Sequence, residues 1–92
     1  MKNNKDDNQL IKKQEIVKGK LIDQYIKYRK IKNLTQGELA DVMGIKRPNI
    51  SRFESGQCNP TLDLLVKMAD SMDLEIKIDL IDKSKRKEDS NE

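Results

Sequence analysis

The chain has 92 residues, of which 38% are charged and 35% are hydrophobic, and its formal net charge is +3. This length allows one domain with a modest core, and so high a charged fraction predicts that part of the chain lies outside that core. With one cysteine and no histidine, the sequence excludes an internal disulfide and gives no basis for a metal site. It also lacks a Ser/His or Cys/His pair and a glycine-rich phosphate loop, so we expect no enzyme activity, no catalytic residues and no cofactor.

The N-terminal segment, residues 1–18, is predicted to be a partly disordered arm. Its first nine residues are nearly all polar, but the rest includes four apolar side chains, Leu10, Ile11, Ile16 and Val17. Two arrangements are open: a separate short helix, or one long helix that Gly19 weakens by about 1 kcal/mol. The segment either binds a partner or packs onto its own domain.

Two helices are predicted before Gly44. The first covers about residues 19–32, where five side chains recur at helical spacing: Leu21, Ile22, Tyr25, Ile26 and Arg29. The second begins at Thr35, whose hydroxyl forms a capping box with Glu38, and its apolar face consists of Leu39, Ala40 and Met43. Gly44 ends this helix because glycine accepts the left-handed conformation of a helix C-terminus.

The next helix, from about Lys46, carries the side chains that are most informative about function. Pro48 is tolerated in its first turn, and Ile50 and Phe53 form its buried face. Its remaining polar side chains then point away from the core: Asn49, Ser51 and Arg52. Asparagine matches the edge of adenine, arginine matches the edge of guanine, and a helix N-terminus favours phosphate, so this pattern indicates DNA recognition.

A last helix is predicted after Thr61, with core positions at Leu62, Leu65, Met68, Ala69 and Met72. Leu64 and Val66 lie off this stripe and are candidates for a second apolar surface, such as a dimer contact.

Residues 74–81 alternate apolar and charged side chains with period two, which predicts one β-strand. A single strand needs a partner, and the most economical partner is its copy in a second chain. We therefore predict a homodimer whose strand residues are Leu74, Ile76, Ile78 and Leu80. Such a dimer would hold two recognition helices roughly 34 Å apart over a palindromic operator. An unpaired strand, or one paired with a different protein, is the alternative.

From about Lys20 to Met72, the chain resembles the Cro/lambda-repressor (Xre-type) helix-turn-helix family of DNA-binding domains. The residues that carry the resemblance are Arg29, Thr35-Gln36, Glu38-Leu39-Ala40, Gly44-Ile45, the run from Ile50 to Gly56, and Asn59-Pro60. Together with the predicted strand, the resemblance implies a mostly α fold. This fold is a compact four- to five-helix lambda-repressor-like domain with one C-terminal β-strand, paired across a homodimer.

The resemblance also implies roles for individual residues. In the family, the glutamine that opens the second helix contacts a phosphate and braces the recognition helix, and Gln36 occupies that position. The expected DNA-binding residues are Gln36, Lys46, Arg47, Asn49, Ser51, Arg52, Ser55, Gln57 and Asn59. Arg29 and Glu54 correspond to a partly buried structural ion pair. Lys46 departs from the family, which more often has a Ser or Thr cap there.

A strand directly after the last helix, followed by a polar tail, is similar to antitoxins of bacterial toxin–antitoxin operons. The resemblance implies a repressor that binds palindromic double-stranded DNA as a homodimer, regulates its own operon and neutralises a toxin protein. A stand-alone Xre-type regulator is the alternative. No apolar run could span a membrane and no signal peptide is evident, so we expect a cytoplasmic protein without a membrane partner.

The expected organisation is therefore an N-terminal arm (1–18), the helix-turn-helix domain (19–73), a dimerisation strand (74–81) and a disordered charged tail (82–92).

Overall fold

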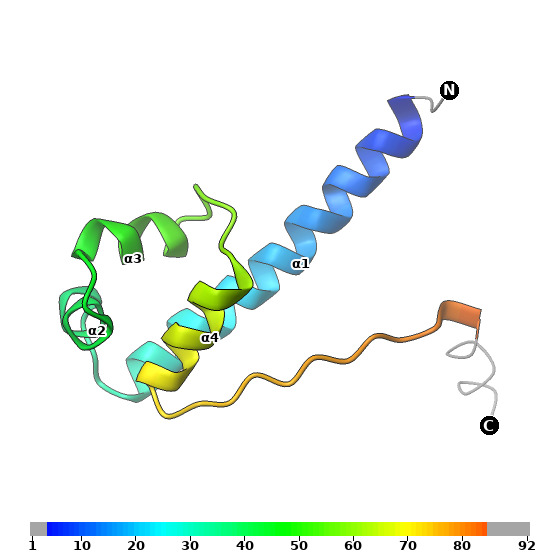
Figure 1. The fold of residues 1–92 in the computed structure, drawn as a ribbon. Helices are drawn as coiled ribbons and strands as arrows, with labels where there is room; N and C mark the ends of the chain where they lie inside the picture. The colour runs from blue at the N-terminus through cyan, green and yellow to red at the C-terminus, as the bar shows by residue number, and fades with distance from the viewer. Residues whose placement is uncertain (1–3, 85–92) are drawn as a thin grey trace.

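The computed structural model describes residues 4–84, so the expected tail lies outside the described residues from position 85 onward. Within residues 4–84 the chain forms four helices: α1 (Asn4–Ile31), α2 (Gln36–Met43), α3 (Arg47–Glu54) and α4 (Leu62–Ser71). Helices α2, α3 and α4 gather around the C-terminal half of α1, whereas its N-terminal half projects beyond them (Figure 1). The chain thus has a helical domain at one end of a long helix.

Helix α1 is continuous through Gly19 and has 28 residues. Of the two arrangements that the sequence left open, the structure has the single long helix. A methyl group added at Gly19 would meet no atom within 4 Å, so the glycine is not required by packing. The apolar side chains of the projecting half remain exposed, with exposed fractions of 53% for Leu10 and 66% for Val17. They do not join the core of their own domain.

The helices end in a common backbone motif. Four residues that follow helices have a positive φ between 59° and 79°: Asn33, Gly44, Gly56 and Asp73. After each of them, the next backbone amide donates to the carbonyl oxygen five residues earlier, for example Ile45 to Ala40 at 3.0 Å and Leu74 to Ala69 at 2.8 Å. This is the Schellman motif, which satisfies the free carbonyls of a helix end and reverses the chain sharply. The motif explains why short connections suffice to bring the helices together.

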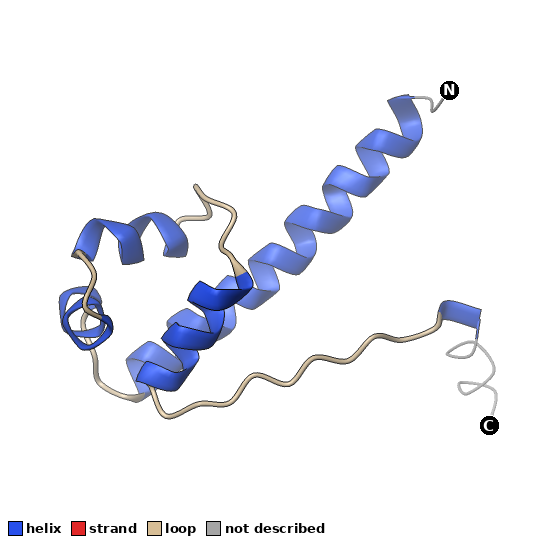
Figure 2. Cartoon of the chain, in the orientation of Figure 1, coloured by secondary structure: helices blue, strands red, loops and turns tan. Residues whose placement is uncertain are grey.

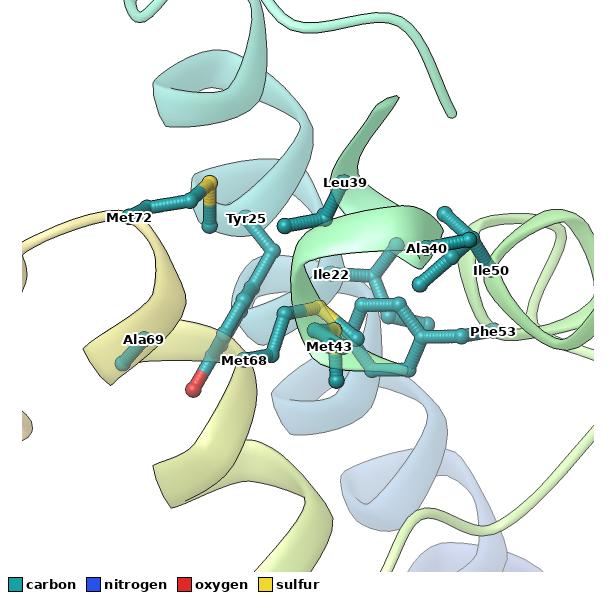
Figure 3. Packing of buried hydrophobic residues seen from close by; sticks show 10 residues of the cluster. All are labelled: Ile22, Tyr25, Leu39, Ala40, Met43, Ile50, Phe53, Met68, Ala69 and Met72. Atoms are coloured by element: carbon teal, nitrogen blue, oxygen red, sulfur yellow. The ribbon is translucent and has the colours of Figure 1, made fainter. Parts of the chain in front are cut away.

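The core lies where the C-terminal half of α1 meets the other three helices (Figure 3). Its buried members are Ile22, Tyr25, Leu39, Ala40, Met43, Ile50, Phe53, Met68, Ala69 and Met72. The rings of Tyr25 and Phe53 meet edge to face, with centroids 5.4 Å apart. The Tyr25 hydroxyl donates to the Leu65 carbonyl oxygen at 2.8 Å, and burial raises the pKa of this phenol. Helix α1 is therefore fixed to both α3 and α4.

The predicted C-terminal β-strand is wrong. The chain is extended after Asp73, but the described residues contain no strand, and Figure 2 shows this segment as a loop up to a short helical piece at Lys83 and Ser84. The first two of the expected strand residues are half-buried against the core and the last two are exposed: Leu74, Ile76, Ile78 and Leu80. Packing on helices explains the first part of the alternation without a ladder, and a strand has no neighbouring strand to pair with in this chain.

In the described part of the chain, no helix is both long enough and apolar enough to cross a membrane.

Candidate nucleic-acid interface

Helix α3 has one face fixed in the core and one face open to solvent. Ile50 and Phe53 are 0% exposed and hold α3 against the other helices of the domain. Four of the expected DNA-binding side chains are exposed: Lys46, Arg47, Asn49 and Arg52. A fifth, Ser51, is half-buried. The residues predicted to read DNA therefore lie together at α3, on or beside its open face.

Two of these side chains are already in contact. The Arg52 Nη2 donates to the Asn49 Oδ1 at 2.6 Å, because the two residues are three positions apart on the helix. An amide oxygen can accept a second hydrogen bond, and both the Asn49 amide nitrogen and the Arg52 guanidinium keep further donors. The pair therefore offers a pre-oriented set of donors and acceptors of the kind that matches base edges.

The N-terminus of α3 is unusual for an isolated helix. Lys46 stands at the N-cap without a side-chain cap, Arg47 follows it, and the first turn has no acidic residue. Cations near the positive end of the helix dipole are unfavourable, whereas a bound anion there would be stabilised by the dipole and by both side chains. The N-terminus of α3 is thus suited to binding a phosphate, although its two cations make the helix itself less stable.

A charged network holds α3 in position beneath this face. The Glu54 carboxylate accepts from the Arg29 Nε at 2.6 Å and from the Arg29 Nη2 at 3.0 Å. The Arg29 Nη1 also donates to the Leu34 carbonyl oxygen at 2.8 Å. From α2, the Gln36 Nε2 donates to Glu54 at 2.9 Å. Arg29 and Glu54 thus form an ion pair between α1 and α3, and Gln36 joins it at the start of α2.

The loop after α3 is fixed by contacts of its own. The Ser55 Oγ donates to the Arg52 carbonyl oxygen at 3.0 Å, and Gln57 is exposed. The Lys18 Nζ donates to the Asn59 Oδ1 at 3.2 Å and lies 3.7 Å from the Glu15 carboxylate. Sequence reasoning missed Lys18, because nothing in the local pattern links two residues 41 positions apart.

In the part of the chain that the structure describes, no three His, Cys, Asp or Glu side chains are grouped as metal ligands would be.

The sequence of this same region decides the family. Residues 26–78, which include α2, α3, α4 and the turn between α2 and α3, match the helix-turn-helix family. The chain belongs to the helix-turn-helix family. Its membership confirms the Xre-type assignment that the sequence motifs gave, and it makes α2 and α3 the two helices of the motif.

Two curated proteins described as transcriptional regulators or repressors are similar to the chain. The cryptic phage CTXphi transcriptional repressor RstR of Vibrio cholerae is 37% identical over 57 residues, which are 62% of this chain and 51% of RstR. An uncharacterized HTH-type transcriptional regulator of Haemophilus influenzae is 40% identical over 48 residues, which are 52% of this chain and 49% of that regulator. The chain thus spans about half the length of these two relatives.

Among solved structures, this chain is similar in fold to a chain of a toxin-antitoxin module from Streptococcus pneumoniae. The TM-score is 0.62 with 20% sequence identity, and the match covers 89% of this chain and 97% of that chain. At this identity the likeness shows the fold alone.

Proposed function

We propose that this protein is a sequence-specific, DNA-binding transcriptional repressor that acts on a palindromic operator as a homodimer. The observation that carries the proposal is the face of α3, where Asn49 and Arg52 are paired on a helix fixed by Glu54. Lys46 and Arg47 at its N-terminus would hold phosphates, and Asn49 and Arg52 would contact bases. The expected roles of Gln36, Ser51, Ser55, Gln57 and Asn59 remain part of this proposal.

Binding to DNA upstream of the protein's own coding sequence tests this function. Fluorescence anisotropy would compare the wild type with Asn49→Ala and Arg52→Ala on that DNA and on a scrambled duplex. Each substitution should lower base discrimination by about 1–3 kcal/mol, because each removes a contact with a base edge. Lys67→Ala, on the exposed side of α4, is the matched control and should change neither affinity. Equal affinity of the wild type for both duplexes would refute sequence-specific binding.

We further propose that the repressor is an antitoxin that regulates its own operon and neutralises a toxin protein. The support is the shared fold with a toxin-antitoxin module. Co-expression with the product of the adjacent gene tests this role, with growth of the host as the readout. Rescue of growth by the wild type and also by Asn49→Ala would support a neutralising role that is separate from DNA binding.

A stand-alone regulator without a toxin is the second candidate, favoured by the similarity to the repressor RstR. In that case neither the wild type nor Asn49→Ala would change the growth of the host. No product of a neighbouring gene would co-purify with the protein.

A further inference from the structure

The projecting half of α1 has an apolar stripe that its own domain leaves largely uncovered. Positions 10, 14, 17, 21, 24 and 28 alternate in spacing between four and three residues, so they form one seam along the helix: Leu10, Gln14, Val17, Leu21, Gln24 and Tyr28. The core side chains Ile22, Tyr25 and Arg29 lie about a quarter turn away from this seam. Leu10 and Val17 lie on the projecting half, before the core begins at Ile22, and are more than half exposed.

The seam continues into hollows of the domain surface. Near its middle, Val17 and Leu21 line a hollow together with Pro60 and Leu65. Further along α1, Leu21 and Tyr28 line a second hollow with Leu74 and Ile76. Leu21 belongs to both hollows, so one groove runs along α1. The start of the extended C-terminal segment already occupies its far end.

The charges beside the seam restrict what can cover its open end. Lys13, Lys20 and Lys27 each precede a seam residue and line the same side of it. Residues 10–20 hold four lysines and one glutamate. Pairing this seam with the seam of a second α1 would place lysine against lysine, which is unfavourable. The groove instead fits a segment that is apolar and acidic.

The chain carries such a segment after α4. Residues 73–82 contain four acidic residues and one lysine. Beyond the half-buried Leu74 and Ile76, three apolar side chains lie in solvent, with exposed fractions of 65% for Ile78, 97% for Leu80 and 63% for Ile81. In Figure 1 the segment diverges from α1 after it leaves α4, and no described residue of the segment lines the hollow beside Val17, so it does not cover that part of the groove in its own chain.

We propose that residues 78–82 of a second copy of this chain dock along the seam of α1 from Leu10 to Leu21, over the part of the groove beside Val17. The exchange is reciprocal, so each copy gives one acidic, apolar segment and receives one in its basic, apolar groove. A two-fold arrangement closes the assembly at two chains and covers both exposed apolar surfaces. The contact is made by side chains on a helix and needs no β-ladder. It rests on the homodimer in the proposed function and names the surface that forms it.

Disulfide trapping tests the contact in the full chain. In a Cys58→Ser background, one chain carries Val17→Cys and another chain of different tagged mass carries Leu80→Cys, both at exposed positions. Mixing the two should give a covalent heterodimer between Cys at position 17 and Cys at position 80. Lys30→Cys, on the exposed side of α1 away from the seam, replaces Val17→Cys as the control and should give none.

Three other outcomes would overturn the proposal. One is an absence of the heterodimer. Another is a disulfide within one chain when both cysteines are on the same chain, which would place the segment on its own α1. A third is trapping only between two copies of Leu80→Cys, which would mean that the segments pair with each other.

Charge exchange gives an independent measurement by sedimentation equilibrium. Asp79→Lys alone, or Lys13→Glu with Lys20→Glu, should raise the dimer dissociation constant several-fold, and combining all three should restore it at least in part. A lack of restoration, or a wild type that stays monomeric at every concentration, would refute the contact. A chain that is trapped but binds no operator would refute the proposed function instead and leave the contact standing.

Discussion

Glu54 joins α3 to two other helices through hydrogen bonds. Its carboxylate accepts three hydrogen bonds, two from Arg29 on α1 and one from Gln36 on α2. The Arg29 and Glu54 side chains are only 11% and 9% exposed, so little water could replace a lost partner. One acidic side chain thus links three helices directly beneath the proposed DNA face.

Replacing Glu54 by Ala should lower the free energy of unfolding by about 3–5 kcal/mol, because the Arg29 guanidinium would stay partly buried without its counter-charge. Urea denaturation measures this loss. The double variant Arg29→Met with Glu54→Leu should lose less, because it removes both charges. Glu15→Ala is the control, since its carboxylate is 65% exposed in a long ion pair, and should cost less than about 0.5 kcal/mol. Similar losses in Glu54→Ala and Glu15→Ala would contradict this account of the network.

At the scale of residues, the sequence predicts which side chains face away from the core better than it predicts which side chains are in contact. The outward row of Asn49, Ser51 and Arg52 follows from helical spacing once Ile50 and Phe53 are taken as buried. The link between Arg29 and Glu54 was available only through the family resemblance, because no local pattern joins two residues 25 positions apart. The contact between Lys18 and Asn59 had no signal of either kind.

At the scale of elements, the N-terminus of α3 is less well stabilised than the N-termini of α2 and α4. Lys46 caps nothing, whereas Thr35 and Thr61 cap α2 and α4 through their hydroxyl oxygens. A helix that lacks the cap used by its neighbours, and has two cations at that end, would be stabilised by an anion bound there, as the proposed contact with phosphate requires.

Lys46→Ser should therefore stabilise the protein and weaken its binding to DNA. The Asn49 amide already donates to the carbonyl oxygen of residue 46 at 2.9 Å, so the serine hydroxyl would share this donor and add only about 0.5 kcal/mol to the free energy of unfolding. Loss of the lysine should also reduce the dependence of operator affinity on salt, by about 0.9 in the log–log slope for each phosphate contact removed. Thermal unfolding and anisotropy titrations at several salt concentrations measure the two effects. An unchanged slope would mean that Lys46 contacts no phosphate.

The elements themselves were predicted with uneven success, for physical reasons. Capping residues, glycine and helical spacing identified α2, α3 and α4, because these signals are local. The prediction of a strand at residues 74–81 was wrong because the alternation of apolar and charged residues shows only which side chains face a surface. Helices α1 and α4 supply that surface for Leu74 and Ile76. The length of α1 was left open because the cost of Gly19, about 1 kcal/mol, is too small to decide between one helix and two.

At the scale of the whole molecule, the chain divides into a packed domain and a helix that extends out of it. The core side chains of α1 begin at Ile22, and from Leu10 to Val17 its apolar side chains are more than half exposed. An isolated helix as short as the projecting half of α1 is marginal in water, and Gly19 separates this half from the packed half. The two halves of α1 should therefore differ greatly in stability within one continuous helix.

Hydrogen exchange should resolve this difference. At low protein concentration, amides of residues 8–18 should open at a cost of about 1–2 kcal/mol, whereas the amide of Tyr25 should exchange only on global unfolding. Gly19→Ala should add about 1 kcal/mol of protection to the projecting half, because it removes the main break in helix propensity. Raising the concentration should protect the same residues if a second copy covers the groove, while the amides of α2 serve as the unaffected reference. Uniform protection along α1 at every concentration would mean that the projecting half is held by contacts within a single chain, which its exposed apolar side chains argue against.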